Sequence, residues 1–192
     1  MIPLREAYWR RVRQAGAKLD TRVFIDKHPL NTLKLPLIAR LFPDARILVC
    51  RRDPRDVVLS CFRRRFLMNP HMYQLLSLPG AAAFYAATMS VAGRAQEVWA
   101  LNQLVVSHEA LVGDFEANSR LVCDFLGLRW TPALSDVAAR IKDRSIATPS
   151  GAQLARGLNA EGIGQWRRYL THLTPVLPLL QPWVERFGYE VE

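Results

Sequence analysis

Residues 46–60 restrict the possible folds of this chain more than any other stretch. The four apolar residues 47–50 are typical of a short buried strand. Arg51 and Arg52 follow at once, and Asp53-Pro54 then provides a helix N-cap and a proline suited to the first helical position. A strand, a cationic turn and a helix start predict an α/β fold in which the turn binds phosphate. Free backbone N–H groups and a forked guanidinium both favour such an anion.

Ser60 lies further along the same predicted helix, eight residues after Arg52, and can add a hydroxyl to the same anion. The alternative for these two residues is a surface arginine and a helical serine that bonds back to the preceding turn. Arg51 should face the opposite side of the strand end and is expected to be structural.

The composition favours an anionic partner. Lys and Arg number 26 against 17 Asp and Glu, which gives a formal net charge of +9 and a pI near 10.1. Such a balance suits nucleotides, polyanions or acidic lipid, while a solvated basic surface is the plainer alternative. The length of 192 residues fits one domain of ordinary size.

The cysteines and the apolar runs bear on the compartment. Three cysteines without CxxC spacing argue against a disulfide framework or a zinc site and fit a reducing compartment. No apolar run approaches the ~18 residues that span a membrane, and the N-terminus has no signal-peptide core. We therefore expect a cytoplasmic protein without a membrane partner.

Apolar periodicity predicts an alternation of strands and helices. Strands are expected at 22–26, 46–50 and 104–107. Helices are expected at 4–15, at 32–41 with Asn31 as its cap, from Pro54 onward, at 79–100, at 109–126 ending at Gly127, at 132–142, and as two short pieces within 167–187. This order predicts an α/β, doubly wound parallel sheet with helices on both faces, although three strands are few for a complete one.

Polar clusters follow each predicted strand: Lys27-His28, Arg51-Arg52 and His108-Glu109. In open α/β sheets, ligands bind beyond the carboxyl ends of the strands. We therefore expect the three clusters to converge on one rim of the sheet.

Several spaced motifs carry a resemblance to a known family. They are Asp26-Lys27-x-Pro29-x-Asn31, Leu41-Phe42-Pro43-Asp44-Ala45-Arg46, Arg52-Asp53-Pro54-Arg55-Asp56-Val57-Val58-x-Ser60, Leu126-Gly127, Thr148-Pro149-Ser150, Gly164-x-Trp166-Arg167-Arg168-Tyr169 and Phe187-Gly188-Tyr189. In this order they resemble the sulfotransferases that depend on 3′-phosphoadenosine 5′-phosphosulfate (PAPS). The nearest likeness is to the bacterial tetratricopeptide-linked sulfotransferases and the protein-tyrosine sulfotransferases. The resemblance implies a P-loop-NTPase-like sheet and a metal-free reaction.

The resemblance also implies roles for single residues. Arg52 and Ser60 match the residues that bind the 3′-phosphate of PAPS. Lys27 matches the lysine that touches the transferring sulfuryl group, where an ammonium neutralises developing charge. The alternative for Lys27 is an exposed turn lysine. His28 follows that lysine directly, whereas cytosolic sulfotransferases place their histidine base two residues after it, so the general base stays unassigned.

A late segment resembles the loop that closes over the nucleotide. It consists of Arg156 and the segment Gly162-Ile-Gly164-Gln-Trp166-Arg167, in which glycines permit close backbone approach, and its alternative is an ordinary loop in which Trp166 anchors the next helix. His108 stands where the family usually has a tyrosine beside adenine. In the tyrosine-sulfating relatives a serine stands at the position of Gly164, so one phosphate hydroxyl is expected to be missing.

One family motif has no counterpart in these residues. The Pro-x-x-Ser-Gly-Thr-Thr loop that wraps the 5′-phosphosulfate does not occur. We therefore expect residues 1–192 to be the C-terminal portion of one sulfotransferase domain, incomplete at the N-terminus. A partner chain, a homodimer or a preceding segment would then supply the rest.

The expected function is transfer of a sulfuryl group from PAPS to a hydroxyl acceptor, a small molecule or a protein, with protein tyrosine among the candidates. One alternative is a catalytically inactive nucleotide-binding module. Another is a nucleic-acid binder, suggested by the pI and by Arg63-Arg64-Arg65. Because no helix-turn-helix, zinc-finger or RNP pattern is present, we expect no nucleic-acid partner.

Overall fold

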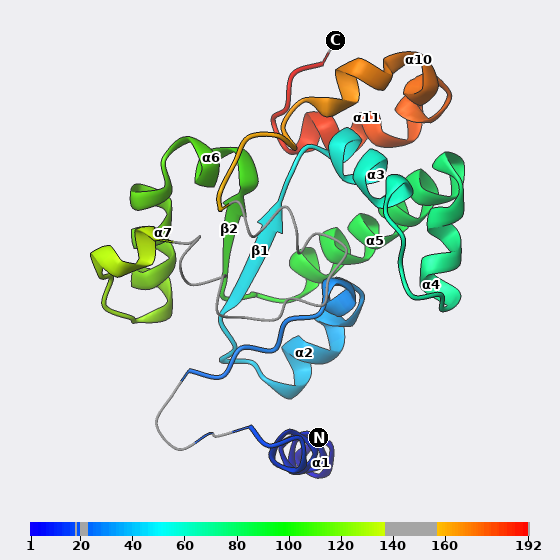
Figure 1. The fold of residues 1–192 in the computed structure, drawn as a ribbon. Helices are drawn as coiled ribbons and strands as arrows, with labels where there is room; N and C mark the ends of the chain where they lie inside the picture. Colours follow the sequence, from blue (N-terminus) through cyan, green and yellow to red (C-terminus); the bar gives the residue numbers. More distant parts are fainter. Residues whose placement is uncertain (18, 20–22, 137–156, 192) are drawn as a thin grey trace. The chain divides into compact units, whose positions relative to one another are not determined.

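The computed structural model describes residues 1–17, 19, 23–136 and 157–191, and the chain forms two compact units (Figure 1). The first unit comprises Met1–Ile47 and Thr88–Asn102. The second comprises Leu48–Ala87 and Gln103–Glu192. The prediction of one domain over 1–192 stays a prediction. Arg156 and the helix predicted beyond residue 136 lie outside the described residues.

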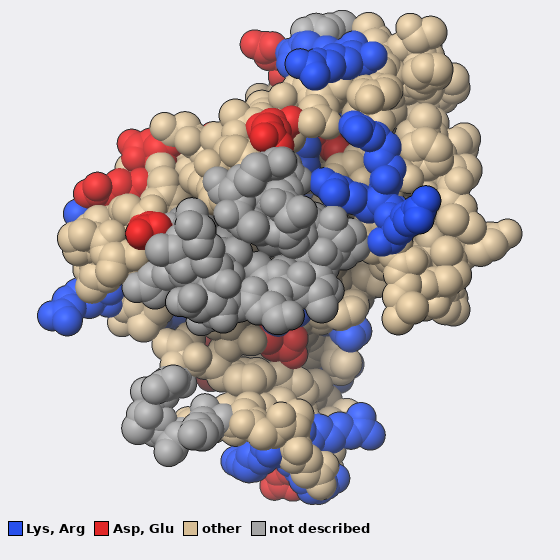
Figure 2. Space-filling view, in the orientation of Figure 1, with Lys and Arg blue, Asp and Glu red and all other residues tan. Residues whose placement is uncertain are grey.

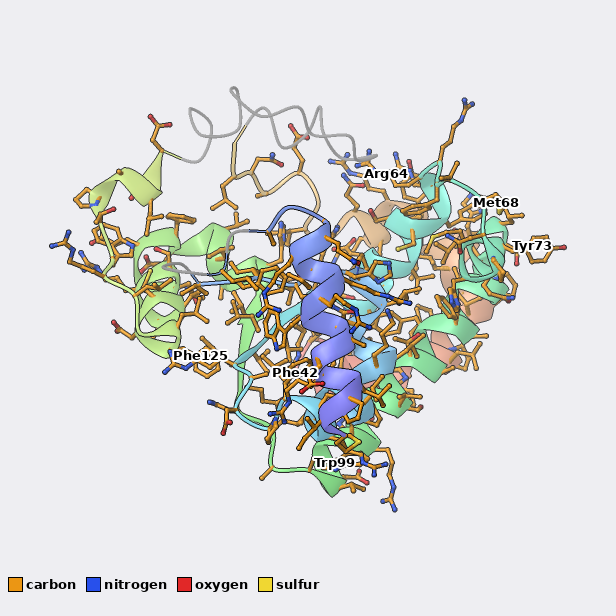
Figure 3. The ribbon with its side chains drawn as sticks, turned by 90° about the horizontal axis from the view of Figure 1, so that it is seen from below. Phe42, Arg64, Met68, Tyr73, Trp99 and Phe125 are labelled. Atoms are coloured by element: carbon orange, nitrogen blue, oxygen red, sulfur yellow. The ribbon has the colours of Figure 1, made fainter. Side chains whose placement is uncertain are left out.

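The first unit is organised by aromatic side chains around α1 (Ile2–Gln14), which confirms the helix predicted at 4–15. Tyr8 and Trp9 each meet the Phe42 ring edge to face, with ring centroids 5.1 and 5.8 Å apart, and Figure 3 shows Phe42 beside this helix. Arg5 donates from Nε to the carbonyl of Leu41, the last residue of α2 (Leu35–Leu41), at 2.7 Å. Ring packing and this hydrogen bond hold α1 against α2.

The strand predicted at 22–26 is wrong for the residues that the structure describes. Val23–Asp26 has no regular secondary structure, and Val23 and Ile25 are half or more exposed. A strand is held by pairing with a neighbouring strand, and no described segment pairs with this one, so its apolar character alone does not make it a strand.

Asn31 is not the cap that was predicted. It lies inside the 3₁₀ helix η1 (Pro29–Lys34), and its amide donates to Asp26 Oδ1 at 3.1 Å. His28 caps η1 instead, because its Nδ1 accepts from the backbone N–H of Leu30 at 3.2 Å.

The sheet has two parallel strands, β1 (Ile47–Arg51) and β2 (Gln103–Ser107), which lie side by side in Figure 1. Both strands and their parallel pairing confirm the α/β expectation, but the fold is mostly helical. β1 is half-buried rather than buried, and Cys50 in it is exposed. A strand with a single described neighbour keeps one edge unpaired, which accounts for this exposure.

Helices make up most of the second unit. Its elements are α3 (Pro54–Arg63), α4 (Pro70–Tyr73), η2 (Gln74–Leu76), the first half of α5 (Leu78–Val98), α6 (His108–Gly113), α7 (Phe115–Leu126), η3 (Pro132–Ser135), η4 (Gln165–Tyr169), α10 (Leu170–Leu173), η5 (Thr174–Val176) and α11 (Leu177–Arg186). The helix predicted at 109–126 is divided at Asp114, whose carboxylate accepts from the N–H of Ala117 at 2.9 Å and begins α7. Gly127, at φ 68°, ends α7 as predicted.

The core of the second unit lies between α3 and the C-terminal helices. Trp166, Leu173 and Leu180 are each 1% exposed or less, and they pack with Val58 and Leu59 of α3. α3 therefore rests on the C-terminal helices, which Figure 1 shows beside it, and this fixes the direction in which its N-terminus points.

Candidate functional site

The turn between β1 and α3 is held by hydrogen bonds that the sequence pattern predicted only in part. Asp53 caps α3 as expected, its Oδ1 accepting from the N–H of Arg55 at 2.9 Å. The N–H of Asp53 itself donates to Glu109 Oε1 at 3.0 Å, 56 residues further on. The turn is thus fixed to the end of β2 as well as to its own helix.

Two of the three arginines at this turn are used by the protein itself. Arg55 is buried, donates to both oxygens of Asp53 and to the carbonyl of Glu190, and stacks over the Trp166 ring at 3.7 Å. Arg51 lies over the Phe187 ring at 4.2 Å. These contacts suit a structural role for both side chains.

Arg52 is placed differently. Its Nη2 donates to the carbonyl of Gly162 and lies 3.9 Å from Asp56 Oδ2. Its Nε is buried and has no hydrogen-bond partner among the described residues. A buried guanidinium nitrogen without a partner is costly, so this end of Arg52 is suited to receive an anion.

Asp56 joins this arginine to a distant loop. Its side chain is fully buried, and it accepts from the backbone N–H of Gly164 at 2.7 Å and of Trp166 at 2.9 Å. Burial raises the pKa of Asp56, and these two hydrogen bonds and the Arg52 charge offset only part of that effect. Asp56 therefore brings the late loop to the first turn of α3.

The loop residues singled out in the sequence have distinct surroundings. Gly164 has φ +67°, a left-handed conformation in which a residue with a Cβ is strained. Trp166 is 1% exposed, so its ring fills the core. Arg167 lies 4.8 Å from that ring and pairs with Glu190 at 3.2 Å, with its side chain 46% exposed.

His108 lies at the end of β2, as the first residue of α6. Its ring is half-buried, and Nδ1 has no hydrogen-bond partner among the described residues. Burial lowers the pKa of His108, and the nearby Arg52 charge lowers it further. Arg52 Nε and His108 Nδ1 are two of the three buried side-chain nitrogens without a described partner, and they belong to one electrostatic neighbourhood; the third is Trp166 Nε1, in the core.

Glu109 is a further carboxylate of this region, beside Asp53 and Asp56. Burial alone would raise the pKa of Glu109, but hydrogen bonds from the Asp53 N–H, Ser107 and Tyr189 lower it below its usual value.

Two of the three predicted clusters, Arg51-Arg52 and His108-Glu109, converge, because the Asp53 N–H donates to Glu109. Lys27 and His28 belong to the first unit, where Lys27 is exposed beside the Asp26 carboxylate that binds Tyr8.

A pocket of about 220 Å³ opens beside the turn. Its charged lining consists of four carboxylates and two arginines, namely Asp53, Asp56, Glu109, Glu190, Arg55 and Arg167. Because acids outnumber cations and Arg52 does not line it, this pocket is unsuited to a phosphate.

Ser60 is half-buried on α3, one helical turn after Asp56 and on the same face. Arg52 precedes the N-cap of α3, and it approaches this face through its Nη2, which lies 3.9 Å from Asp56 Oδ2. No cluster of three or more His, Cys, Asp or Glu that would hold a metal occurs in the part of the chain that the structure describes.

Comparisons with known proteins are consistent with this geometry. Residues 3–132 match the profile of the Sulfotransferase family, which is more than half of the chain. The chain belongs to the sulfotransferase family.

The fold of this sulfotransferase-family chain is also that of a solved structure. The sulfotransferase domain from the curacin biosynthetic pathway matches with a TM-score of 0.62 and 18% identity, over 98% of this chain and 69% of that one. An uncharacterized protein of Aquifex aeolicus (strain VF5) is 24% identical over 168 residues, which is 86% of this chain. The chain spans 22% of the length of that curated relative.

Sequence reasoning quoted Arg55 and Asp56 within the motif after β1 but assigned neither a role, and it placed Gly162 in the late loop without its contact to Arg52. Asp56 follows Arg52 by four residues and precedes the apolar Val57-Val58-Leu59, a pattern that signals a carboxylate on a buried helix face. The role of Gly162 has no local signal, because it depends on a contact 110 residues away.

Among the described residues, no helix combines the length and the apolar character needed to cross a bilayer.

Proposed function

We propose that this protein transfers the sulfuryl group of PAPS to a hydroxyl acceptor, and that Arg52 is the residue that recognises the 3′-phosphate. The observation that carries the proposal is the buried Nε of Arg52, which has no partner among the described residues. A doubly charged phosphate beside the start of α3 would satisfy this nitrogen and gain from the helix dipole.

Three further side chains suit the same nucleotide. Ser60, on the Asp56 face of α3, would donate its hydroxyl to the 3′-phosphate. His108, whose Nδ1 has no described partner, would lie beside the adenine or a phosphate. Arg167 would add positive charge from its half-exposed position, whereas we assign the buried Trp166 to anchoring the loop.

Two residues stay proposals on sequence grounds. Lys27 would neutralise the charge that develops on the leaving phosphate oxygen, with PAPS supplying the activated sulfuryl group. Arg156 would close over the nucleotide. The two strands would then belong to a doubly wound, P-loop-NTPase-like sheet of the kind found in this family.

The acceptor would approach the segment after α3. Figure 2 shows Lys and Arg side chains gathered beside the end of α3, where Arg63, Arg64 and Arg65 follow one another. Tyr73 and Met68 are 65% and 53% exposed, and Figure 3 shows both at the outer edge of this segment. Basic and apolar side chains together suit an acceptor that carries negative charge, such as a protein tyrosine with acidic neighbours.

Calorimetric titration with the desulfated nucleotide, 3′-phosphoadenosine 5′-phosphate (PAP), tests the proposal. Micromolar binding that weakens at least tenfold in Arg52→Ala is expected, since charge-assisted hydrogen bonds contribute about 1.5–3 kcal/mol each. Binding to PAP without transfer from radiolabelled PAPS would favour the nucleotide-binding module. Equal affinity in wild type and Arg52→Ala would refute the phosphate assignment.

A further inference from the structure

Arg52 is held in position by Gly162, which lies outside the turn between β1 and α3. Gly162 is buried, and its carbonyl accepts from Arg52 Nη2. A Cβ added at Gly162 would lie 2.9 Å from Nη2 and 3.2 Å from Cζ of Arg52. The φ of Gly162 is not positive, so its backbone suits any residue, and a Cβ at this position would displace the Arg52 guanidinium from the place it holds.

Asp56 fixes the same loop to α3. It accepts from the N–H groups of Gly164 and Trp166 with one oxygen each, and the oxygen bound to Gly164 faces Arg52 at 3.9 Å. Trp166 is held in the core at the same time. Loop, carboxylate and guanidinium therefore restrict one another, and one end of Arg52 has a defined position before any ligand arrives.

We infer that Gly162 and Asp56 are positioning residues that set the specificity of this protein for a 3′-phosphorylated nucleotide. They hold Nη2 of Arg52 on the loop and leave Nε for the phosphate. The inference rests on the proposed function and deepens it. Because Arg52 is already positioned, its side chain loses less conformational entropy when a ligand binds. This lower entropic cost strengthens binding only for a ligand that has the 3′-phosphate.

The experiment compares two nucleotides that differ by this phosphate. The affinities of PAP and of 5′-AMP are measured by calorimetry for the wild type, Gly162→Ala and Asp56→Asn. The ratio of the two affinities isolates the 3′-phosphate contact, because both nucleotides share every other group. Gly113→Ala is the matched control, since a Cβ at Gly113 meets nothing within 4 Å.

We expect the wild type to prefer PAP by at least about 100-fold, as two charge-assisted hydrogen bonds allow. Gly162→Ala and Asp56→Asn should reduce this ratio by about tenfold through weaker PAP binding, with 5′-AMP unchanged. Gly113→Ala should behave as the wild type. A damaged loop would weaken both nucleotides alike and leave the ratio intact, and that result would overturn the inference.

The outcomes separate the inference from the proposed function. A wild type that binds PAP and 5′-AMP equally refutes the proposed function and the inference with it. A wild type that prefers PAP, beside a Gly162→Ala variant with the same preference, refutes the inference alone.

Hydrogen exchange of the Gly164 and Trp166 amides gives a second readout that needs no ligand. Their protection should fall in Asp56→Asn and stay unchanged in Gly113→Ala. Unchanged protection in Asp56→Asn would contradict the role of the carboxylate.

Discussion

The two cations proposed to act on the nucleotide have surroundings that are built in different ways. Around Arg52, the turn after β1, the end of β2 and the loop at 162–166 are joined by hydrogen bonds between residues 56 to 110 positions apart. Around Lys27, the neighbouring Asp26 accepts two exposed hydrogen bonds, from Tyr8 and Asn31, which are 18 and 5 positions away.

This difference predicts separate effects on nucleotide affinity and on the rate of sulfuryl transfer. A preorganised, partly buried arginine contributes to ground-state affinity, whereas an exposed lysine contributes mainly where charge develops during transfer. Changes near Arg52 should therefore alter stability and affinity, and changes near Lys27 should alter turnover with little effect on either.

The largest effect is expected for Trp166→Ala. Removing a fully buried indole from the core of the second unit should lower the free energy of unfolding by about 3–5 kcal/mol. Trp9→Ala, in the first unit, should cost clearly less, because Trp9 is only half-buried. Urea unfolding of both variants measures the contrast, and equal losses would show that the two units do not differ in this way.

Nucleotide affinity should separate the two cations next. Arg52→Ala should weaken PAP binding at least tenfold, and Lys27→Ala should change it by less than about threefold. Arg51→Ala removes one positive charge at the same turn, from a side chain that stacks on Phe187, and serves as the control for the loss of charge alone. A Lys27→Ala variant that loses affinity as severely as Arg52→Ala would remove the distinction.

Acidification should act on the second unit through Glu109. Its pKa is lower in the folded chain than the ordinary 4.5, so its contribution to stability is fully present above that value. The contribution is lost as the pH falls through the folded pKa. Glu109→Gln should therefore lose less stability than the wild type between neutral pH and acid, as followed by urea midpoints, and identical pH profiles would contradict this.

The smallest effect is expected for Tyr8→Phe in the first unit. Burial and the hydrogen bond to Asp26 raise the pKa of Tyr8 to about 12. Losing this partly exposed hydrogen bond should cost about 1 kcal/mol or less. Because burial also raises the pKa of Tyr85 and Tyr189, ultraviolet titration should show one fewer phenol with a raised pKa in the variant than in the wild type.

The parts that local sequence determines were predictable. Asp53-Pro54 begins α3 and Gly127 ends α7, because capping and backbone conformation act within a few residues. The absence of a strand at 23–26 was not predictable from these residues, since a strand depends on a partner that lies elsewhere.

The residues of the candidate site likewise divide into those that local sequence predicts and those that depend on distant contacts. Arg52 and Ser60 follow from a motif within one turn and one helix, and the convergence with His108-Glu109 follows from parallel strands. The hydrogen bonds that Asp56 accepts from Gly164 and Trp166 join residues 108 and 110 positions apart, and no local pattern encodes which loop a carboxylate will reach.

A crystal structure of the chain with PAP would test the central claim most directly. We expect the 3′-phosphate within hydrogen-bond distance of Arg52 Nε and the Ser60 hydroxyl, with Nη2 of Arg52 still on the Gly162 carbonyl. A bound nucleotide whose 3′-phosphate lies away from Arg52 would contradict the account.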